Sequence, residues 1–127
     1  MSEAENVKMK ILVCDDEYAT RLVLKAYLKT YPVLAIEASG GEEAIKKVAE
    51  ENPDVLIIDY SMPGMTGLDV VRELDGRVPV IVITSEGFME QTEEELKKYA
   101  AVYLVKPVTE AIIVAAVEKA TGQKITE

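Results

Sequence analysis

Short apolar segments of strand type recur along this chain, and amphipathic segments of helical type separate them. Three of the apolar segments, residues 10–14, 55–58 and 102–105, have the length of single strands. An alternation of strand and helix predicts a parallel sheet that helices cover on both faces. In such sheets the functional site lies beyond the carboxyl ends of the strands, so the pattern predicts an α/β fold and the position of its site.

Charged residues directly follow each of these three segments. Asp15 and Asp16 follow the first, Asp59 follows the second, and Lys106 follows the third. Because parallel strands end at the same edge of a sheet, the four side chains are expected to meet in one crevice. Charged groups seldom gather in a small domain unless they hold an ion or take part in chemistry, so this crevice is the candidate site.

Hydrophobic periodicity and the positions of Pro and Gly indicate the remaining elements. Two further strands are expected at 33–38 and 79–84. The first helix is expected after Asp16, with Val23 and Leu24 in the stripe that faces the core.

The last two helices have clear start and stop signals. The fourth is expected to be short, residues 93–99, with Thr92 as its N-terminal cap after a loop at 85–91. The fifth is expected at 111–120, and Gly122 is its expected stop.

Composition limits the class of protein. The chain has 127 residues, a net charge of −9 and no histidine. It suits one domain, residues 1–127, with a core over about 8–121 and no visible output domain. The negative charge argues against direct nucleic-acid binding, and no segment is long enough to insert in a membrane. The single cysteine fits a reducing compartment, so a cytoplasmic location is expected.

The residue types of the candidate site favour phosphoryl chemistry. Oxygen ligands without histidine select a hard cation, so Mg²⁺ is expected, with Mn²⁺ as the alternative. A divalent ion and the Lys106 ammonium are what a transferring phosphoryl group needs on its oxygens. Asp59 is alone at its strand end and is the candidate nucleophile, whereas the Asp15–Asp16 pair suits ion binding.

Five short motifs, in order and at compatible spacing, resemble those of response-regulator receiver domains. They are Asp15–Asp16, Asp59, the loop Met62–Gly67, Thr84–Ser85 and Tyr103–Pro107. The resemblance covers nearly the whole chain. It implies a doubly wound, flavodoxin-like three-layer sandwich with a five-stranded parallel sheet in the order 2-1-3-4-5.

The resemblance implies a function in two-component or phosphorelay signal transduction. Asp59 would accept a phosphoryl group from a histidine kinase or a histidine phosphotransfer protein, in a reaction that requires Mg²⁺. The protein would catalyse only its own phosphorylation and dephosphorylation, and no other enzymatic activity is expected.

The resemblance also implies a role for each site residue. Asp16 and Asp59 would bind Mg²⁺ through their side chains, and Ser61 would bind it through its backbone carbonyl. Asp15 would act mostly through metal-bound water. Lys106 would pair with the phosphoryl group.

Two residues are implied to transmit the change of state. Thr84 would move its hydroxyl onto a phosphoryl oxygen, and Tyr103 would turn inward behind it. The resemblance also implies a cis peptide bond between Lys106 and Pro107, and the geometry gives a reason, because the chain must turn sharply to aim Lys106 inward.

The chain departs from the family pattern at a few positions. Thr66 stands where the family usually has aspartate, and Tyr99 stands where a glycine commonly ends the fourth helix. The segment between Asp59 and Thr84 is short, which implies a brief third helix. None of these departures touches the phosphorylation chemistry.

The fifth helix carries more apolar residues than one buried stripe needs. Ile112, Val114 and Ala115 are expected to point away from the sheet. A helix that is apolar on all sides is usually covered on all sides. These residues, with the fifth strand, therefore predict an output face that contacts a downstream target or mediates phosphorylation-dependent self-association.

Other functions are weighed against this one. The main alternative is a degenerate receiver fold that serves as an interaction module without phosphorylation. A phosphatase with an aspartate nucleophile is disfavoured, because its second aspartate would stand where Ser61 does. A flavin-binding module is disfavoured because Asp15 and Asp16 would repel a phosphate.

Overall fold

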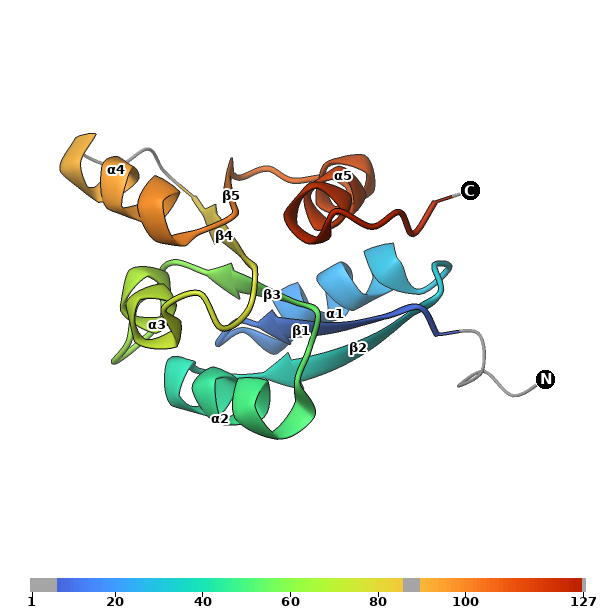
Figure 1. Cartoon of the computed structure of the whole chain (residues 1–127), viewed down its shortest axis with the longest axis horizontal. Helices are drawn as coiled ribbons and strands as arrows, with labels where there is room; N and C mark the ends of the chain where they lie inside the picture. Colours follow the sequence, from blue (N-terminus) through green and yellow to red (C-terminus); the bar gives the residue numbers. More distant parts are fainter. Residues whose placement is uncertain (1–6, 86–89, 127) are drawn as a thin grey trace.

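Five parallel strands form one sheet, because a helix that packs back on the sheet joins each strand to the next. The computed structural model describes residues 7–85 and 90–126. The order across the sheet is β2-β1-β3-β4-β5, which confirms the predicted fold class and strand order (Figure 1). The strands are β1 Met9–Cys14, β2 Val33–Ala38, β3 Val55–Asp59, β4 Val80–Thr84 and β5 Val102–Val105.

The helices lie on both faces of the sheet. α1 and α5 pack together on one face, and α2, α3 and α4 lie side by side on the other (Figure 1). The predicted three-layer sandwich is therefore confirmed, and α3 is as brief as expected. Within the described ranges the helices are α1 Tyr18–Leu28, α2 Gly41–Glu51, α3 Gly67–Leu74, α4 Glu90–Tyr99 and α5 Glu110–Thr121.

Strand residues alternate between two hydrophobic cores. In β1, Leu12 and Cys14 face the core under α2, α3 and α4, whereas Ile11 and Val13 face the core under α1 and α5. Successive side chains of a strand point to opposite faces, so a strand that is covered on both faces must be apolar throughout. This is why the strand segments are continuous apolar runs in the sequence.

α4 begins at Glu90, three residues before the predicted start at Glu93. Thr92 lies inside the helix, so its predicted role as the cap is wrong. Glutamate and glutamine are good helix formers, and they extend the helix toward its N-terminus past the expected cap. Of the predicted loop at 85–91, residues 86–89 lie outside the described residues.

The end of α4 needs no glycine. The Ala100 N–H donates to the Leu96 carbonyl at 2.7 Å, and the Ala101 N–H donates to the Val80 carbonyl at 2.8 Å. The chain therefore passes from the helix directly into β5. Tyr99 is partly buried against the core under α2, α3 and α4, which gives its large side chain a packing role at this corner.

Two valines occupy helix faces other than those predicted. Val23, expected to face the core, is 49% exposed, and Val114, expected to point away from the sheet, is 5% exposed. α5 contacts both the sheet and α1, so its buried arc includes Val114 as well as Ile113 and Val117. The prediction that Val114 belongs to an exposed interface is therefore wrong, whereas Ile112 is 41% exposed as expected.

The residues after α5 fold back and extend the core past its expected limit at residue 121. Ile125 is 3% exposed and joins the core under α1 and α5. The Glu118 carboxylate accepts hydrogen bonds from the backbone N–H groups of Ile125 at 2.8 Å and Thr126 at 3.1 Å. Gly122, with φ of 70°, ends α5 in the left-handed conformation, as the sequence predicts.

Candidate functional site

The register of the sheet brings the three predicted acids together. Cys14 of β1 is paired with Ile58 of β3, so Asp15 and Asp59, the next residues of the two strands, lie across from each other. Asp15, Asp16 and Asp59 each offer a carboxylate oxygen, and these oxygens all lie within 4.8 Å of one another. The expectation that these side chains meet in one crevice is confirmed.

Lys106 reaches the same crevice from β5. Its N–H donates to the Thr84 carbonyl at 2.7 Å, which continues the pairing of β4 with β5. Its ammonium Nζ lies 3.5 Å from Oδ1 of Asp59. The bond between Lys106 and Pro107 is cis, as predicted. The four charged side chains therefore form one constellation at the carboxyl edge of the sheet.

Burial opposes the ionisation of the two inner carboxyls. Asp15 is 3% exposed, and this burial raises its pKa from 3.8 to about 6, with the charge of Asp59 adding to the effect. The hydrogen bond from the Glu17 N–H to Asp15 Oδ1, at 2.8 Å, acts in the opposite direction and lowers the pKa. Burial likewise raises the pKa of Asp59, although the Lys106 ammonium opposes that change. Burial, with a smaller contribution from the neighbouring carboxylates, therefore disfavours the ionised form of both carboxyls.

The donor set fits a hard divalent cation. Carboxylate oxygens are the ligands that Mg²⁺ and Mn²⁺ prefer, and a divalent ion would relieve the repulsion among them. The nearby thiol of Cys14 is no competing ligand, because burial raises its pKa to about 12 and keeps it protonated. Ser61 is exposed, two residues after Asp59, and the ligand role of its carbonyl stays a prediction.

The two predicted switch residues lie beside this crevice. Thr84 is 2% exposed at the end of β4, directly after Ile83, which is paired with Asp59. Tyr103 is partly buried and packs against the core under α2, α3 and α4. Their positions suit the implied movements, and the movements themselves stay predictions.

The loop after β3 is held close to the strand ends. The Tyr60 N–H donates to the Ile83 carbonyl, and the Gly67 N–H donates to the Tyr60 carbonyl, both at 2.8 Å. A Cβ on Gly67 would lie only 3.0 Å from the Tyr60 Cα, so this close approach requires glycine.

The departure at Thr66 has a structural explanation. The Thr66 hydroxyl oxygen accepts a hydrogen bond from the Asp69 N–H at 3.2 Å, and the Asp69 carboxylate accepts one from the Thr66 N–H at 2.9 Å. This reciprocal capping box begins α3. Threonine therefore serves the helix start in the position where aspartate was expected.

The structure reveals an exposed apolar surface on α1 that the sequence analysis missed. Tyr18, Leu22 and Val23 are 61%, 46% and 49% exposed, and Ala19 and Ala26 beside them are also exposed. We call these five residues the α1 surface. It begins two residues after Asp16, next to the acidic crevice. The sequence signal was present, because this side of the helix lacks the polar residues that normally face solvent.

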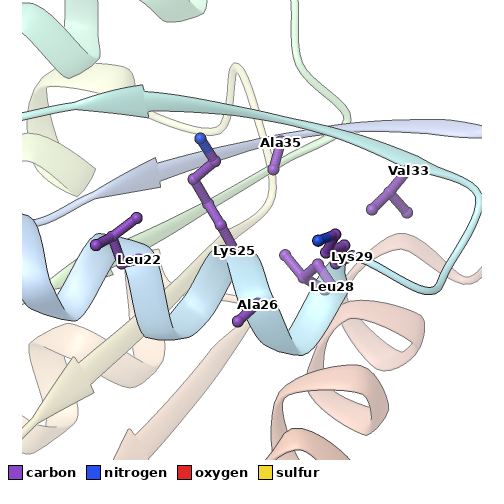
Figure 2. Close-up of a pocket in the computed structure, with 7 residues that line it drawn as sticks. All are labelled: Leu22, Lys25, Ala26, Leu28, Lys29, Val33 and Ala35. Atoms are coloured by element: carbon purple, nitrogen blue, oxygen red, sulfur yellow. The ribbon is translucent and has the colours of Figure 1, made fainter.

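A groove of about 420 Å³ lies between α1 and β2, and it shares Leu22 and Ala26 with the α1 surface (Figure 2). Its walls include Leu28 of α1 and Val33 and Ala35 of β2, with Lys25 and Lys29 at its rim. Lys29 and Val33 mark the end of the sheet opposite to the acidic crevice. The groove is therefore no part of the candidate site.

Comparisons with known proteins all indicate the same family. The model of the response regulator receiver domain matches residues 11–118. The chemotaxis protein CheY of Thermotoga maritima is 32% identical over 114 residues, which are 87% of this chain and 95% of that protein. A solved response regulator receiver domain protein from Clostridium thermocellum has a TM-score of 0.82 and 31% identity, with 90% of this chain and 94% of that chain covered.

Some relatives are longer than this chain. The transcriptional regulatory protein ResD of Bacillus subtilis is 36% identical over 100 residues, which are 77% of this chain and 42% of ResD. The chain thus spans about two fifths of the length of several curated relatives that it matches. In the described part of this chain, none of the helices has the length and apolar character that a membrane crossing requires.

The buried carboxyl of Asp15 predicts a pH-dependent cost to the metal-free protein. The native pKa of about 6 lies above the ordinary 3.8, so the native state holds this proton to higher pH than the unfolded state does. The contribution of Asp15 to the free energy of unfolding should therefore fall as pH rises from 4 to 7. Asp15→Asn cannot titrate, and its stability advantage over the wild type should grow by about 2 to 3 kcal/mol across this range.

Urea unfolding in EDTA at several pH values measures this difference. Mg²⁺ should then stabilise the wild type more than the variant, because the ion offsets the repulsion of the ionised carboxylate. A difference between variant and wild type that stays constant from pH 4 to 7 would contradict the prediction.

Proposed function

This chain belongs to the response regulator receiver domain family of two-component signalling, and from that premise we propose that it accepts a phosphoryl group on Asp59. One observation carries the proposal: the Asp59 carboxylate lies within 4.8 Å of two other carboxylates and 3.5 Å from the Lys106 ammonium. Asp59 is also partly accessible, with its side chain 11% exposed, whereas Asp15 is buried. Of the two carboxyls at the facing ends of β1 and β3, Asp59 is therefore the one open to an incoming phosphoryl group.

The proposed reaction is a phosphoryl transfer between side chains. An Asp59 carboxylate oxygen attacks the phosphorus of a phosphohistidine on the donor protein, and an O–P bond forms as the N–P bond breaks. The imidazole nitrogen keeps the electron pair of the broken bond. Lys106 pairs with an oxygen of the transferred group. Hydrolysis by water later returns the carboxylate and inorganic phosphate, and the proposed catalysis is limited to these two steps on Asp59.

Receiver domains generally bind Mg²⁺ at an acidic pocket, and the donor set here fits that ion. Asp16, Asp59 and the Ser61 carbonyl would hold it, and Asp15 would act through bound water. When bound, the ion supplies positive charge for the phosphoryl oxygens. The residues would have separate tasks: Asp59 would provide the nucleophile, the exposed Asp16 would be an ion ligand, and Lys106, 3.5 Å from Asp59, would neutralise charge on the transferred group.

The phosphodonor is a histidine kinase or a histidine phosphotransfer protein, in keeping with the two-component relatives. We place its docking contact on the α1 surface, because this exposed apolar area adjoins the crevice where the phosphohistidine must arrive. The Tyr27 hydroxyl donates to the Val108 carbonyl at 3.4 Å, which joins α1 to the connection that follows Lys106. The proposed setting is the cytoplasm.

The output is proposed to leave through β5 and α5. Phosphorylation adds negative charge beside Thr84 and Lys106, at the ends of β4 and β5. Val105 and Ile112 are 47% and 41% exposed, and Ala115 is exposed on the outer side of α5. These three residues form the output surface, which contacts a downstream target or a second phosphorylated copy. The buried Val114 is excluded from it.

The alternative is a receiver fold that acts as an interaction module without phosphorylation. The intact set of Asp15, Asp16, Asp59, Thr84 and Lys106 argues against it, because a module of that kind has no need for crowded carboxylates whose burial costs stability. The labelling experiment below separates the two functions.

Asp59→Asn should abolish phosphorylation. With acetyl phosphate and Mg²⁺, the wild type should gain the mass of one phosphoryl group, and EDTA should prevent this gain. Asp69→Asn is the matched control, because Asp69 lies in the capping box of α3 and outside the crevice. Equal labelling of wild type and Asp59→Asn would refute the assignment of the acceptor. A wild type that is never labelled would favour the interaction module.

Leu22→Glu should slow phosphotransfer from a protein donor and leave labelling by acetyl phosphate unchanged. A buried charge in the docking contact should lower kcat/KM for the donor by about tenfold or more, equal to about 1.4 kcal/mol. Leu34→Glu is the control, because Leu34 is also 46% exposed but lies on the edge strand β2. A panel of phosphorylated kinases supplies the donor. Equal losses in both variants, or none in either, would contradict docking on α1.

Ile112→Glu should leave the phosphorylation of Asp59 intact and weaken the contact made by the phosphorylated protein. Small apolar surfaces contribute only a few kcal/mol, so the loss should appear as about a tenfold weaker association. Sedimentation of the phosphorylated chain and pull-down of a target measure it, with Leu34→Glu again as the control. Wild-type behaviour in both assays would show that the output surface makes no contact.

A further inference from the structure

The guanidinium of Arg21 connects α1 to the residue that follows β1, at the acidic crevice, and to the neighbouring strand β2. Its Nη1 donates to the backbone carbonyl of Asp15 at 2.8 Å, and its Nε donates to the Glu37 carboxylate at 3.0 Å. The ring of Tyr18 lies 5.5 Å below it. The Arg21 side chain is only 14% exposed, so these contacts are shielded from solvent. Three contacts therefore hold the Arg21 guanidinium, which indicates that its position matters for the site.

The Asp15 carbonyl needs a partner from outside the helix backbone. α1 begins at Tyr18, and its first helical hydrogen bond runs from the Arg21 N–H to the Glu17 carbonyl. The Asp15 carbonyl precedes this bond and receives the Arg21 side chain instead. This carbonyl belongs to the peptide unit that joins Asp15 to Asp16, so the Arg21 contact restrains the backbone that carries both carboxylates. Without that contact, the two side chains would lose a restraint that keeps them near Asp59.

The hydrogen bond from Arg21 to the Asp15 carbonyl affects the position of the backbone more than the charge of the crevice. Glu37 accepts hydrogen bonds from Arg21 and from Lys25, whose Nζ lies 3.0 Å from Oε2, and these two partners lower the pKa of Glu37. The guanidinium charge is thereby neutralised on the side of β2. A planar guanidinium reaches both acceptors at once, whereas an ammonium is a single point charge and cannot span them in the same way.

From these contacts we propose that Arg21 is a positioning residue for the Asp15–Asp16 pair. It holds the Asp15 carbonyl so that the carboxylates converge with Asp59, and Glu37 holds Arg21 in turn. This inference rests on the proposed Mg²⁺-dependent phosphorylation. Outer contacts that orient metal ligands typically change metal affinity 10- to 100-fold when they are lost.

Lys25 offers a matched control on the same helix. Figure 2 shows its side chain extending from α1 toward the strands, at the rim of the groove. It binds the same Glu37 carboxylate, but its described hydrogen bonds do not include the Asp15 carbonyl. Loss of Lys25 should therefore weaken the contact between α1 and β2 without turning the Asp15–Asp16 peptide.

The experiment compares Arg21→Gln, Arg21→Lys and Lys25→Gln in the intact chain. Calorimetry measures Mg²⁺ affinity, urea unfolding in EDTA measures stability, and acetyl phosphate at saturating Mg²⁺ measures the phosphorylation rate. We expect Arg21→Gln to weaken Mg²⁺ binding about tenfold, Arg21→Lys to restore little of it, and Lys25→Gln to stay within about twofold of wild type. All three should lose some stability.

The outcomes separate the possible failures. Wild-type Mg²⁺ affinity in Arg21→Gln would overturn the inference and leave a merely structural role. Full recovery in Arg21→Lys would also overturn it, because charge rather than geometry would then suffice. If Arg21→Gln fails to fold in EDTA, Arg21→Lys against Lys25→Gln decides the question alone. A wild-type chain that binds no Mg²⁺ would overturn the proposed function itself.

Discussion

Crowding of like charge at one edge of a parallel sheet is the constraint on which the rest of the site depends. The register that pairs β1 with β3 forces Asp15 and Asp59 together, and Asp16 completes the set. Burial makes this costly, as the raised pKa values of Asp15 and Asp59 show. Positive charge relieves it when the carboxyls are ionised, and Lys106 supplies one such charge from β5. A site built this way is poised to take a divalent ion and a phosphoryl group.

The same constraint explains why the surrounding backbone is so closely held. Repelling carboxylates separate unless their main chain is fixed, and each strand end here has its own restraint. Arg21 binds the Asp15 carbonyl, and the Tyr60–Gly67 hydrogen bond closes the loop after Asp59. Lys106 continues the ladder by its bond to the Thr84 carbonyl. The hydrogen bonds near the crevice thus hold in place an arrangement that electrostatics alone would disperse.

Prediction from sequence succeeded where the physical signal is local. Apolar runs and the positions of Pro and Gly identified all the strands, and Gly122 marked the end of α5, because strand periodicity and helix stops depend on neighbouring residues. It failed where a distant element decides the outcome. Val114 is buried because α1 lies against α5, and Val23 is exposed because no element covers that side of α1 within the described chain. The start of α4 was predicted three residues too late, because the capping pattern at Thr92 was given more weight than the helix propensity of the residues before it.

The sequence by itself determined which residues form the site and which strand ends carry them, because residue types and the alternation of strand and helix segments can be read directly from the sequence. It also determined the sheet order through its resemblance to a family. Only the tertiary structure decided the 3.5 Å approach of Lys106 to Asp59, the hold of Arg21 on the Asp15 carbonyl, and the difference between Ile112 and Val114 in exposure. These three features depend on contacts between segments far apart in the chain, and local sequence patterns do not predict such contacts.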